Sequence, residues 1–579
     1  MNNFNQNEIE IENLSYQYPK GIQPALENIT LQGQKNKFIA VMGKTGAGKT
    51  TLLSTMNGLI PQFSEGELVG TINIRGQDTR NLPIQRQIEQ VGLVLQDPET
   101  QIFGLTVEKD IAFGPVNLAY SVDRINKNVQ KAAELVGLQD YLNKSPEHLS
   151  GGEKQRLAIA GILALDSPIL VFDEPTAELD PEGANKVYEA IRSLVDLENR
   201  TVIFSSHNPY FVLDIADELW ILNNGKLVYT GDASNFFKQN LATDFDGLQM
   251  PEIVDLFSIL RQVNIYKKDS IPLSLIHGEN EIRNILIEKS IDSVAKYPAS
   301  ISTPTLYNKK VVELFSISYR YADGFEALKE VSTSFYSNEI TAIVGKNGAG
   351  KTTLVKQLNG LLKPSEGKIL LDDVDIRKFA IEELSQKVGY VFQNPDHQIF
   401  SASVFEEIEY GLLNIGMEEA LRKERIKEAL ELTGLTGKED IHPFNLSKGE
   451  RQKLAIASVL ALKPKLIIVD EPTTGLDWEG SIKIMNEIRE LKKNGHSLII
   501  ITHNIRLVAE YAERVIIMNA GKIIRDGNVH EVLPDIRLLE ENSLTATQVS
   551  KLVFSLKDLG FPQNIINVEE FTDFMQNIG

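Results

Sequence analysis

Two glycine-rich octapeptides are the part of this chain best suited to hold a phosphate. They read GKTGAGKT from residue 43 and GKNGAGKT from residue 345, and both match the pattern G-x-x-x-x-G-K-[ST]. Each follows an apolar run and precedes a helical pattern, so its backbone N–H groups would surround an anion at a helix N-terminus. We predict that the lysines reach the β- and γ-phosphates of a nucleotide and that the following threonines ligate Mg²⁺. The predicted phosphate-binding residues are Gly43, Lys44, Thr45, Gly46, Ala47, Gly48, Lys49, Thr50 and Thr51, with Gly345, Lys346, Asn347, Gly348, Ala349, Gly350, Lys351, Thr352 and Thr353.

Pairs of adjacent acids follow two other apolar runs, in the pentapeptides VFDEP and IVDEP. A strand that ends in such a pair delivers both carboxylates to the sheet edge where α/β proteins bind ligands. We expect Asp173 and Asp470 to support the Mg²⁺ shell. Glu174 and Glu471 would position and polarise the attacking water of a phosphoryl transfer.

Two histidines, His207 and His503, each follow a further apolar run, in FSSHN and IITHN. A lone histidine is most often a core or solvated residue. Because these two occupy matching places, we interpret both as γ-phosphate contacts, and we assign no function to the other six.

The elements that must position these groups occur twice. The motifs recur in the same order at a nearly constant offset, which indicates two homologous halves. Short β-branched runs at 38–42, 169–173 and 201–206 recur at 340–344, 466–470 and 497–501. They alternate with amphipathic stretches such as 187–197, a pattern typical of an α/β fold with a buried parallel sheet.

Composition limits the class of protein. A chain of 579 residues is too long for one core, and a net charge of -20 argues against wholesale binding of nucleic acid. The absence of cysteine excludes disulfides and thiolate metal sites. The N-terminus does not read as a signal peptide, and no apolar run is long enough to cross a bilayer. Any membrane role is therefore expected to depend on a partner.

The boundaries follow from the repeat. We predict a first nucleotide-binding domain over 1–245, a helical appendage and linker over 246–305, a second nucleotide-binding domain over 306–535 and a helical appendage over 536–579. The helical pattern at 251–263 has an echo at 546–560, which suggests that each half ends in such an appendage.

A phosphate loop, a glutamine segment, an LSGGE-type signature, a DEP motif and a trailing histidine, in that order, resemble the nucleotide-binding domains of ABC proteins. The resemblance covers about residues 6–240 and 310–535. It implies, in each half, a RecA-like parallel-sheet core, an antiparallel β subdomain and a helical subdomain. It also implies that the two domains pair head to tail, here within one chain, with each ATP between the phosphate loop of one and the signature of the other.

The resemblance assigns further residues. Gln96 and Gln393 would link Mg²⁺ to a membrane partner, and the D-loops end in Asp180 and Asp477. Tyr18 and Tyr321 would stack on adenine, although Tyr16 and Tyr319 nearby keep the alternative of plain core or strand-edge tyrosines open. The signature residues are Ser150, Gly151 and Gly152 in the first half and Ser447, Lys448 and Gly449 in the second.

The segments QDPETQIF and QNPDHQIF are similar to those of energy-coupling-factor (ECF) ATPases, with Gln101 and Gln398 as the second glutamine. That subfamily implies an importer with a transmembrane coupling (T) protein and a substrate-capture (S) protein. The ATPase would lie peripherally on the cytoplasmic face of the cell membrane. The substrate would be a micronutrient: a vitamin such as a thiamine precursor first, cobalt or nickel second.

Three alternative functions fit the sequence less well. A tandem ATPase of a sugar-type importer is the nearest, but those typically lose catalytic residues in one half, whereas both halves are intact here. A ribosome-associated tandem ABC protein usually has a basic linker, and the linker here is charge-balanced. A DNA-repair ABC protein would need zinc-binding cysteines or long coiled-coil insertions, and the sequence shows neither.

The second signature reads LSKGE where the first reads LSGGE. Glycine is demanded only where φ is positive or backbone approach is very close. We expect Lys448 to begin a helix with ordinary φ and to be tolerated, with its cation solvated or weakly attracting phosphate.

Overall fold

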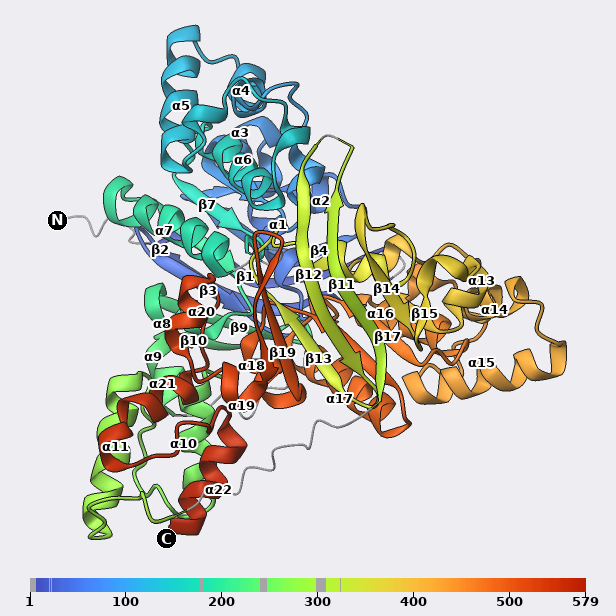
Figure 1. The fold of residues 1–579 in the computed structure, drawn as a ribbon. Helices are drawn as coiled ribbons and strands as arrows, with labels where there is room; N and C mark the ends of the chain where they lie inside the picture. Colours follow the sequence, from blue (N-terminus) through green and yellow to red (C-terminus); the bar gives the residue numbers. More distant parts are fainter. Residues whose placement is uncertain are drawn as a thin grey trace. The chain divides into compact units, whose positions relative to one another are not determined.

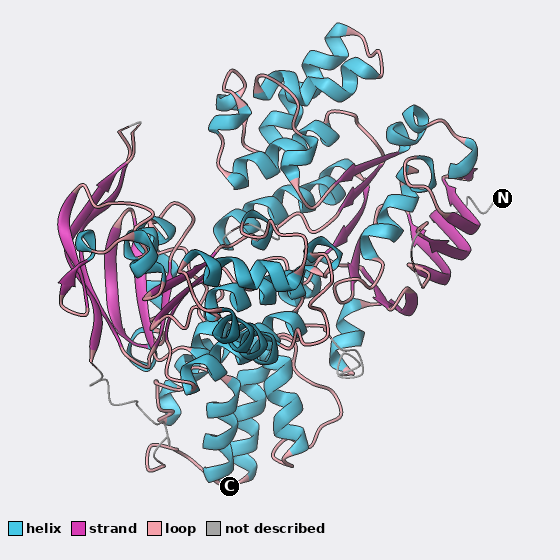
Figure 2. Ribbon diagram, turned by 90° about the vertical axis from the view of Figure 1, so that its right-hand side faces the viewer, coloured by secondary structure: helices cyan, strands magenta, loops and turns pink. Residues whose placement is uncertain are grey.

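The computed structural model describes residues 7–19, 21, 23–176, 179, 181–239, 247–297, 309–322 and 324–578. The chain forms two compact units, one built mainly from residues up to Val254 and the other mainly from the remainder. In Figure 1 the chain runs from blue through green and yellow to red, and Figure 2 separates its strands from its helices. Each unit contains a six-stranded sheet and a four-stranded sheet, as the repeat predicts.

The first unit has a six-stranded sheet in the order β10-β9-β3-β8-β7-β6, parallel except for the edge strand β10. Its antiparallel sheet has the order β2-β1-β4-β5. The strands are β1 (Asn7–Gln17), β2 (Leu26–Gln34), β3 (Phe38–Met42), β4 (Glu67–Ile74), β5 (Gln77–Asp78), β6 (Val91–Val94), β7 (Ile169–Phe172), β8 (Thr201–Ser205), β9 (Glu218–Asn223) and β10 (Lys226–Gly231). The helices are α1 (Lys49–Met56), α2 (Leu59–Gln62), α3 (Ile84–Gln90), α4 (Val107–Asn117), α5 (Val122–Leu135), α6 (Gly151–Leu163), α7 (Pro181–Glu198), α8 (Pro209–Ile215) and α9 (Ala233–Lys238).

The second unit repeats this plan, with sheets β16-β17-β18-β13-β19-β20 and β12-β11-β14-β15. Its strands are β11 (Lys310–Arg320), β12 (Glu326–Tyr336), β13 (Ile340–Val344), β14 (Glu366–Leu371), β15 (Val374–Asp375), β16 (Val388–Val391), β17 (Leu466–Asp470), β18 (Ser497–Ile501), β19 (Arg514–Asn519) and β20 (Lys522–Asn528). Its helices are α12 (Lys351–Leu358), α13 (Ile381–Ser385), α14 (Val404–Asn414), α15 (Glu419–Thr433), α16 (Lys448–Leu460), α17 (Trp478–Lys493), α18 (Ile505–Tyr511) and α19 (Val529–Val532).

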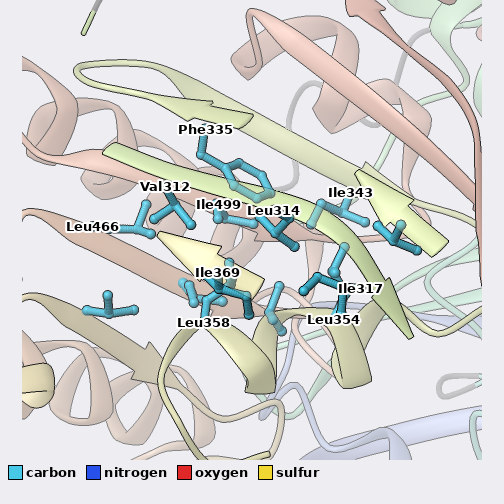
Figure 3. Close-up of a cluster of buried hydrophobic side chains, with 14 of the residues drawn as sticks. Val312, Leu314, Ile317, Phe335, Ile343, Leu354, Leu358, Ile369, Leu466 and Ile499 are labelled. Atoms are coloured by element: carbon cyan, nitrogen blue, oxygen red, sulfur yellow. The ribbon is translucent and has the colours of Figure 1, made fainter. Parts of the chain in front are cut away.

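The helix that follows each phosphate loop is anchored between the two sheets of its unit. In Figure 3, Leu354 and Leu358 of α12 lie among side chains of the antiparallel sheet, such as Leu314, and of the parallel sheet, such as Ile499. All four residues are fully buried. Burial of large aliphatic side chains stabilises a fold by about 1.5–3 kcal/mol each. The phosphate loop therefore leads directly into a helix that is buried in the hydrophobic core of its unit.

Three helices in each unit form the helical subdomain. α4, α5 and α6 contact one another in the first unit, and α14, α15 and α16 do so in the second. The signature motif lies at the start of α6 and of α16. Within the described residues, no helix is both long and apolar enough to span a bilayer.

Two helices coincide with the echoed pattern, α10 (Glu252–Gln262) and α21 (Gln548–Ser555). The regions predicted as appendages also contain α11 (Leu275–Glu288), α20 (Ile536–Glu541) and α22 (Val568–Ile578). α11 packs on α21, and Arg283 of α11 pairs with Asp558 at 2.8 Å (Figure 1). The linker helix α11 and the C-terminal helices therefore share one small helical layer.

Candidate functional site

Both phosphate loops have a backbone that only glycine fits well. Gly48 and Gly350, directly before α1 and α12, have φ of 99° and 98°. A Cβ at either would lie 2.6 Å from a backbone carbonyl oxygen, that of Ala25 or of Ala327. A side chain there would therefore meet both a strained φ and a fixed backbone atom.

The P-loop lysines are buried and folded back over their loops. Lys49 Nζ donates to the carbonyl oxygens of Gly43 at 2.9 Å and Lys44 at 3.3 Å. Lys351 Nζ donates in the same way to Gly345 at 2.7 Å and Lys346 at 3.1 Å. An ammonium group is thus held at the centre of each loop, where a polyphosphate would lie.

The paired acids lie beside the phosphate loops. Thr50 Oγ1 donates to Asp173 Oδ2 at 2.6 Å, so the two predicted magnesium ligands of the first unit are in contact. Asp173 and Asp470 are each 2% exposed, and burial raises the pKa of both carboxyls. Asp470 Oδ1 is buried without a hydrogen-bond partner.

This chemistry fits Mg²⁺, which prefers oxygen ligands and keeps water and phosphate in its shell rather than an all-protein cage. The described part of the chain holds no cluster of three or more His, Asp or Glu side chains that could bind a metal alone.

Both glutamates that follow these aspartates have left-handed backbone, with φ of 47° at Glu174 and 46° at Glu471. Such strain in a non-glycine residue costs of order 1–3 kcal/mol and is concentrated at functional sites. Here it turns each glutamate away from the strand, toward the histidine of the same unit.

The glutamate–histidine contact differs between the units. Glu174 Oε1 lies 2.8 Å from His207 Nε2 and 3.5 Å from Lys49 Nζ. Burial opposes ionisation of Glu174, but the hydrogen bond and charge of His207, with Lys49, lower its pKa to about 2. In the second unit, Glu471 lies 3.2 Å from His503 Nδ1. The glutamate predicted to polarise the attacking water therefore lies beside a histidine in both units, but it contacts a different ring nitrogen in each.

The glutamine segments place Gln96 and Gln393 differently. Gln96 Nε2 donates to Glu174 Oε2 at 3.3 Å, whereas Gln393 is exposed. The second glutamine of each segment holds the backbone N–H of the residue just before the segment, a role that the motif alone did not reveal. Gln101 Oε1 accepts from Leu95 N at 2.8 Å, and Gln398 Oε1 accepts from Phe392 N at 3.2 Å.

The tyrosines predicted to stack on adenine lie at the mouth of each loop. Tyr18 is 40% exposed and Tyr321 is 39% exposed, unlike Tyr16, which is fully buried. The Tyr18 hydroxyl lies 3.2 Å from Thr51 Oγ1, and the Tyr321 hydroxyl lies 3.0 Å from Thr353 Oγ1. Their exposed rings are therefore beside the first turn of α1 and α12.

Each signature serine begins a helix through a capping box. Ser150 N donates to Glu153 Oε2 at 2.8 Å, and Ser447 N donates to Glu450 Oε2 at 2.8 Å. In the third position, a Cβ on Gly151 would meet nothing within 4 Å, so this position of the helix has room for a side chain. The predicted D-loop residue Asp180 lies outside the described residues.

The fourth signature position does not demand glycine within its own unit. Gly152 and Gly449 have no positive φ, and an added Cβ would approach only the nearby leucines, Leu179 at 3.4 Å and Leu476 at 3.8 Å. Ser150 and Ser447 are exposed, so the helix N-terminus remains open to an anion from outside the unit.

Comparison with known proteins agrees with this geometry. The family model described as "ABC transporter" matches residues 26–177 and 328–474. An ABC transporter ATP-binding protein of Methanosarcina mazei is 37% identical over 579 residues, which covers 98% of this chain and 97% of the relative. The chain belongs to the ABC transporter ATP-binding family.

Another ABC transporter ATP-binding protein, from Caldanaerobacter subterraneus, is 36% identical. The match covers 94% of this chain and 95% of that relative. The solved structure of cbiO1 from Clostridium perfringens, part of the ABC transporter complex cbiONQ, is 38% identical. It covers 40% of this chain and 94% of that one, with a TM-score of 0.38. The family match and the two relatives show that the chain is an ATP-hydrolysing transport ATPase with two nucleotide-binding domains.

Proposed function

We propose that this chain is the energy-coupling ATPase of an ECF-type importer and drives uptake of a micronutrient. The observation that carries the proposal is an apolar face beside the glutamine segment of each unit. In the first unit this face is built on Phe103 and Phe113, and the exposed Leu105 and Val116 are close to them in the sequence; Phe103 is 68% exposed and Leu105 80% exposed. In the second unit it comprises Phe400, Tyr410 and Leu413, with Phe400 62% exposed.

Apolar side chains gathered on one face mark an interaction site. The rings within each face already contact one another: Phe103 and Phe113 have centroids 5.8 Å apart, and Phe400 and Tyr410 have centroids 4.7 Å apart. The first phenylalanine of each face lies two residues after the second glutamine of its segment, Gln101 or Gln398. We assign the cytoplasmic helices of a T protein as its occupant, with an S protein capturing the substrate, and thus a peripheral location at the membrane.

In the proposed mechanism, Glu174 and Glu471 orient and polarise the water that attacks the γ-phosphate of ATP. His207 and His503 hold these carboxylates and contact the γ-phosphate, while Lys49 and Lys351 neutralise its developing charge. Mg²⁺, held by Thr50 and Asp173 or by Thr352 and Asp470 with the glutamines Gln96 and Gln393, would supply Lewis-acid stabilisation of the phosphate oxygens.

The paired signature would close each site, since in this family ATP lies between two nucleotide-binding domains. By that rule the segment at 446–450 completes the site of Lys49, and the segment at 149–153 completes the site of Lys351. We also propose domain boundaries after residues 245, 305 and 535. As substrate we propose a thiamine-type vitamin precursor first and cobalt or nickel second, on the subfamily resemblance alone.

The test is reconstitution. The chain is co-expressed with T and S proteins encoded beside it, and uptake of labelled thiamine precursor, Co²⁺ or Ni²⁺ into proteoliposomes is measured with ATP supplied on the ATPase side. We expect ATP-dependent uptake of one of these. Association with ribosomes in place of membrane proteins would overturn the proposal.

Two variants divide the reaction from the docking. Phe103→Ser with Phe400→Ser should weaken capture of the T protein without changing ATPase activity of the chain alone. Glu174→Gln and Glu471→Gln, compared singly in the assembled transporter, should each lower ATPase activity. An unchanged rate for Glu174→Gln would show that its site does not hydrolyse ATP.

A further inference from the structure

The two buried aspartates receive hydroxyl hydrogen bonds from different strands. In the first unit, Ser205 at the end of β8 donates to Asp173 Oδ1 at 2.6 Å. In the second unit, Tyr390 of β16 donates to Asp470 Oδ2 at 2.7 Å. Both donors are buried, with Ser205 fully so and Tyr390 9% exposed. Each aspartate therefore has one fixed donor from the sheet.

The hydroxyl donor comes from one neighbour of the aspartate strand in the first unit and from the other neighbour in the second. The donors have thus exchanged sides of that strand. The strand that ends in the aspartate, or just before it, is flanked by β8 and β6 in the first unit and by β18 and β16 in the second. The residue that matches Ser205 in the repeat is Ile501, and the residue that matches Tyr390 is Leu93. Each unit thus has one hydroxyl and one aliphatic side chain at these places, on opposite sides.

The exchange changes what the donor touches. Ser205 Oγ also accepts from Glu174 N at 2.8 Å, so one hydroxyl ties both acids of the first unit. In the second unit Glu471 N donates to the Ile501 carbonyl oxygen at 2.9 Å instead. Tyr390 therefore acts on Asp470 alone.

We propose that Ser205 and Tyr390 are positioning residues that orient Asp173 and Asp470, each in its own unit, toward the magnesium ion of ATP. The inference rests on the proposed assignment of these aspartates to the magnesium shell. A carboxylate can turn about its Cβ–Cγ bond unless hydrogen bonds hold its oxygens. Ser205 and Tyr390 each hold one oxygen from the sheet, and Thr50 holds the other oxygen of Asp173. Loss of such a partner typically weakens metal affinity by about 10- to 100-fold.

The experiment uses the full chain with Mn²⁺ and a non-hydrolysable ATP analogue, and measures Mn²⁺ binding by electron paramagnetic resonance. The background Lys49→Ala leaves the second phosphate loop as the only nucleotide site, and Lys351→Ala leaves the first. We expect Tyr390→Phe to weaken Mn²⁺ about 10-fold in the first background and not in the second. Ser205→Ala should show the reverse.

A transplant tests the exchange itself. Ser205→Ile alone should weaken Mn²⁺ binding at the first site, and Leu93→Tyr added to it should restore the affinity, since it reproduces the arrangement of the second unit. Tyr511→Phe is the matched control, because the Tyr511 hydroxyl donates to Asn486 at 3.0 Å, away from the aspartate.

Equal Mn²⁺ affinity in Tyr390→Phe, Ser205→Ala and the unmodified chain, with melting temperatures lowered only as far as in Tyr511→Phe, would make the hydroxyls merely structural and overturn the inference. Failure of the unmodified chain to bind Mn²⁺ with the nucleotide would have a different meaning. It would overturn the assignment of the aspartates, and the inference with it.

Discussion

A buried carboxylate in each unit holds the loop that carries the exposed phenylalanine. Asp110 Oδ1 accepts from Phe103 N at 2.8 Å and from Gly104 N at 2.7 Å. In the second unit Glu407 Oε2 accepts from Phe400 N at 3.0 Å and from Ser401 N at 2.9 Å. The shorter acid is therefore paired with glycine, and the longer acid with serine.

This pairing has a steric cause. A Cβ on Gly104 would lie 2.6 Å from both Cα and Cβ of Asp110. Gly104→Ser must therefore push the loop off its acceptor, through overpacking that costs about 1–3 kcal/mol and weakened hydrogen bonds to a charged group worth about 1.5–3 kcal/mol. We expect a loss of about 2.5–6 kcal/mol in the unfolding free energy of the first unit. Asp110→Glu adds one C–C bond of about 1.5 Å, which lets the loop recede while keeping both bonds.

The assay is a double-mutant cycle in urea. Trp220 is buried in the first unit, and a Trp478→Phe background leaves it as the reporter of that unit. Gly104→Ser/Asp110→Glu should recover at least about 1 kcal/mol relative to the sum of the single changes. Gly161→Ser is the control, because a Cβ there meets nothing within 4 Å.

Additive effects, with a coupling free energy within about 0.5 kcal/mol of zero, would refute this reasoning. They would mean that the length of the acid does not set the position of the loop.

Three further predictions concern other contacts. Gly475 has φ 73°, and a Cβ there would overlap the Lys448 amine, so Gly475→Ala should slow ATP turnover, and Lys448→Gly should restore part of the loss. Burial opposes ionisation of Glu450, but a lysine and the capping serine lower its pKa to about 2, so its contribution is present above pH 4.5 and lost as pH falls. The unfolding free energies of Glu450→Gln and the unmodified chain should therefore converge by about 0.5–0.8 kcal/mol between pH 7 and pH 4 in urea titrations. Arg506 pairs with Asp255 of α10 at 2.5 Å, and Arg506→Met should lower the free energy of unfolding by about 3–5 kcal/mol because it leaves the carboxylate without this partner. That loss should appear as faster proteolysis of the linker at unchanged nucleotide affinity.

Much of the fold could be predicted because its signals are local. The apolar runs at 38–42, 340–344 and 497–501 coincide with β3, β13 and β18. The antiparallel sheets followed only from the family resemblance. β1 pairs with β4 across a gap that contains the phosphate loop and α1. Such long-range pairing depends on the tertiary fold, and nothing in the sequence of one strand identifies its partner strand.

The site could be predicted as a set of groups but not as a network. The motifs place Glu174 and His207 at the ends of neighbouring strands, and the structure brings them to 2.8 Å. The donors Ser205 and Tyr390 belong to no shared pattern, because the two halves take the hydroxyl from opposite sides of the aspartate. When the halves are aligned position by position, the change from Ser205 to Ile501 and the change from Leu93 to Tyr390 look unrelated. The order of the strands shows that one compensates for the other.

The lysine of the second signature is likewise matched by a change elsewhere in its own half. Lys448 is the first residue of α16 and has ordinary backbone, as predicted, but its half-buried side chain is not simply solvated. Its Cε would lie 3.1 Å from a Cβ at Gly475, the second residue of the D-loop TGLD. In the first half the signature has Gly151, and the D-loop reads AELD with a glutamate at that second place. Each half therefore combines one long charged side chain with one glycine at these two positions, in opposite order and with opposite charge. A degraded motif would lose the glycine of the signature without a matching change elsewhere, so the paired change favours a second signature adapted to its own D-loop.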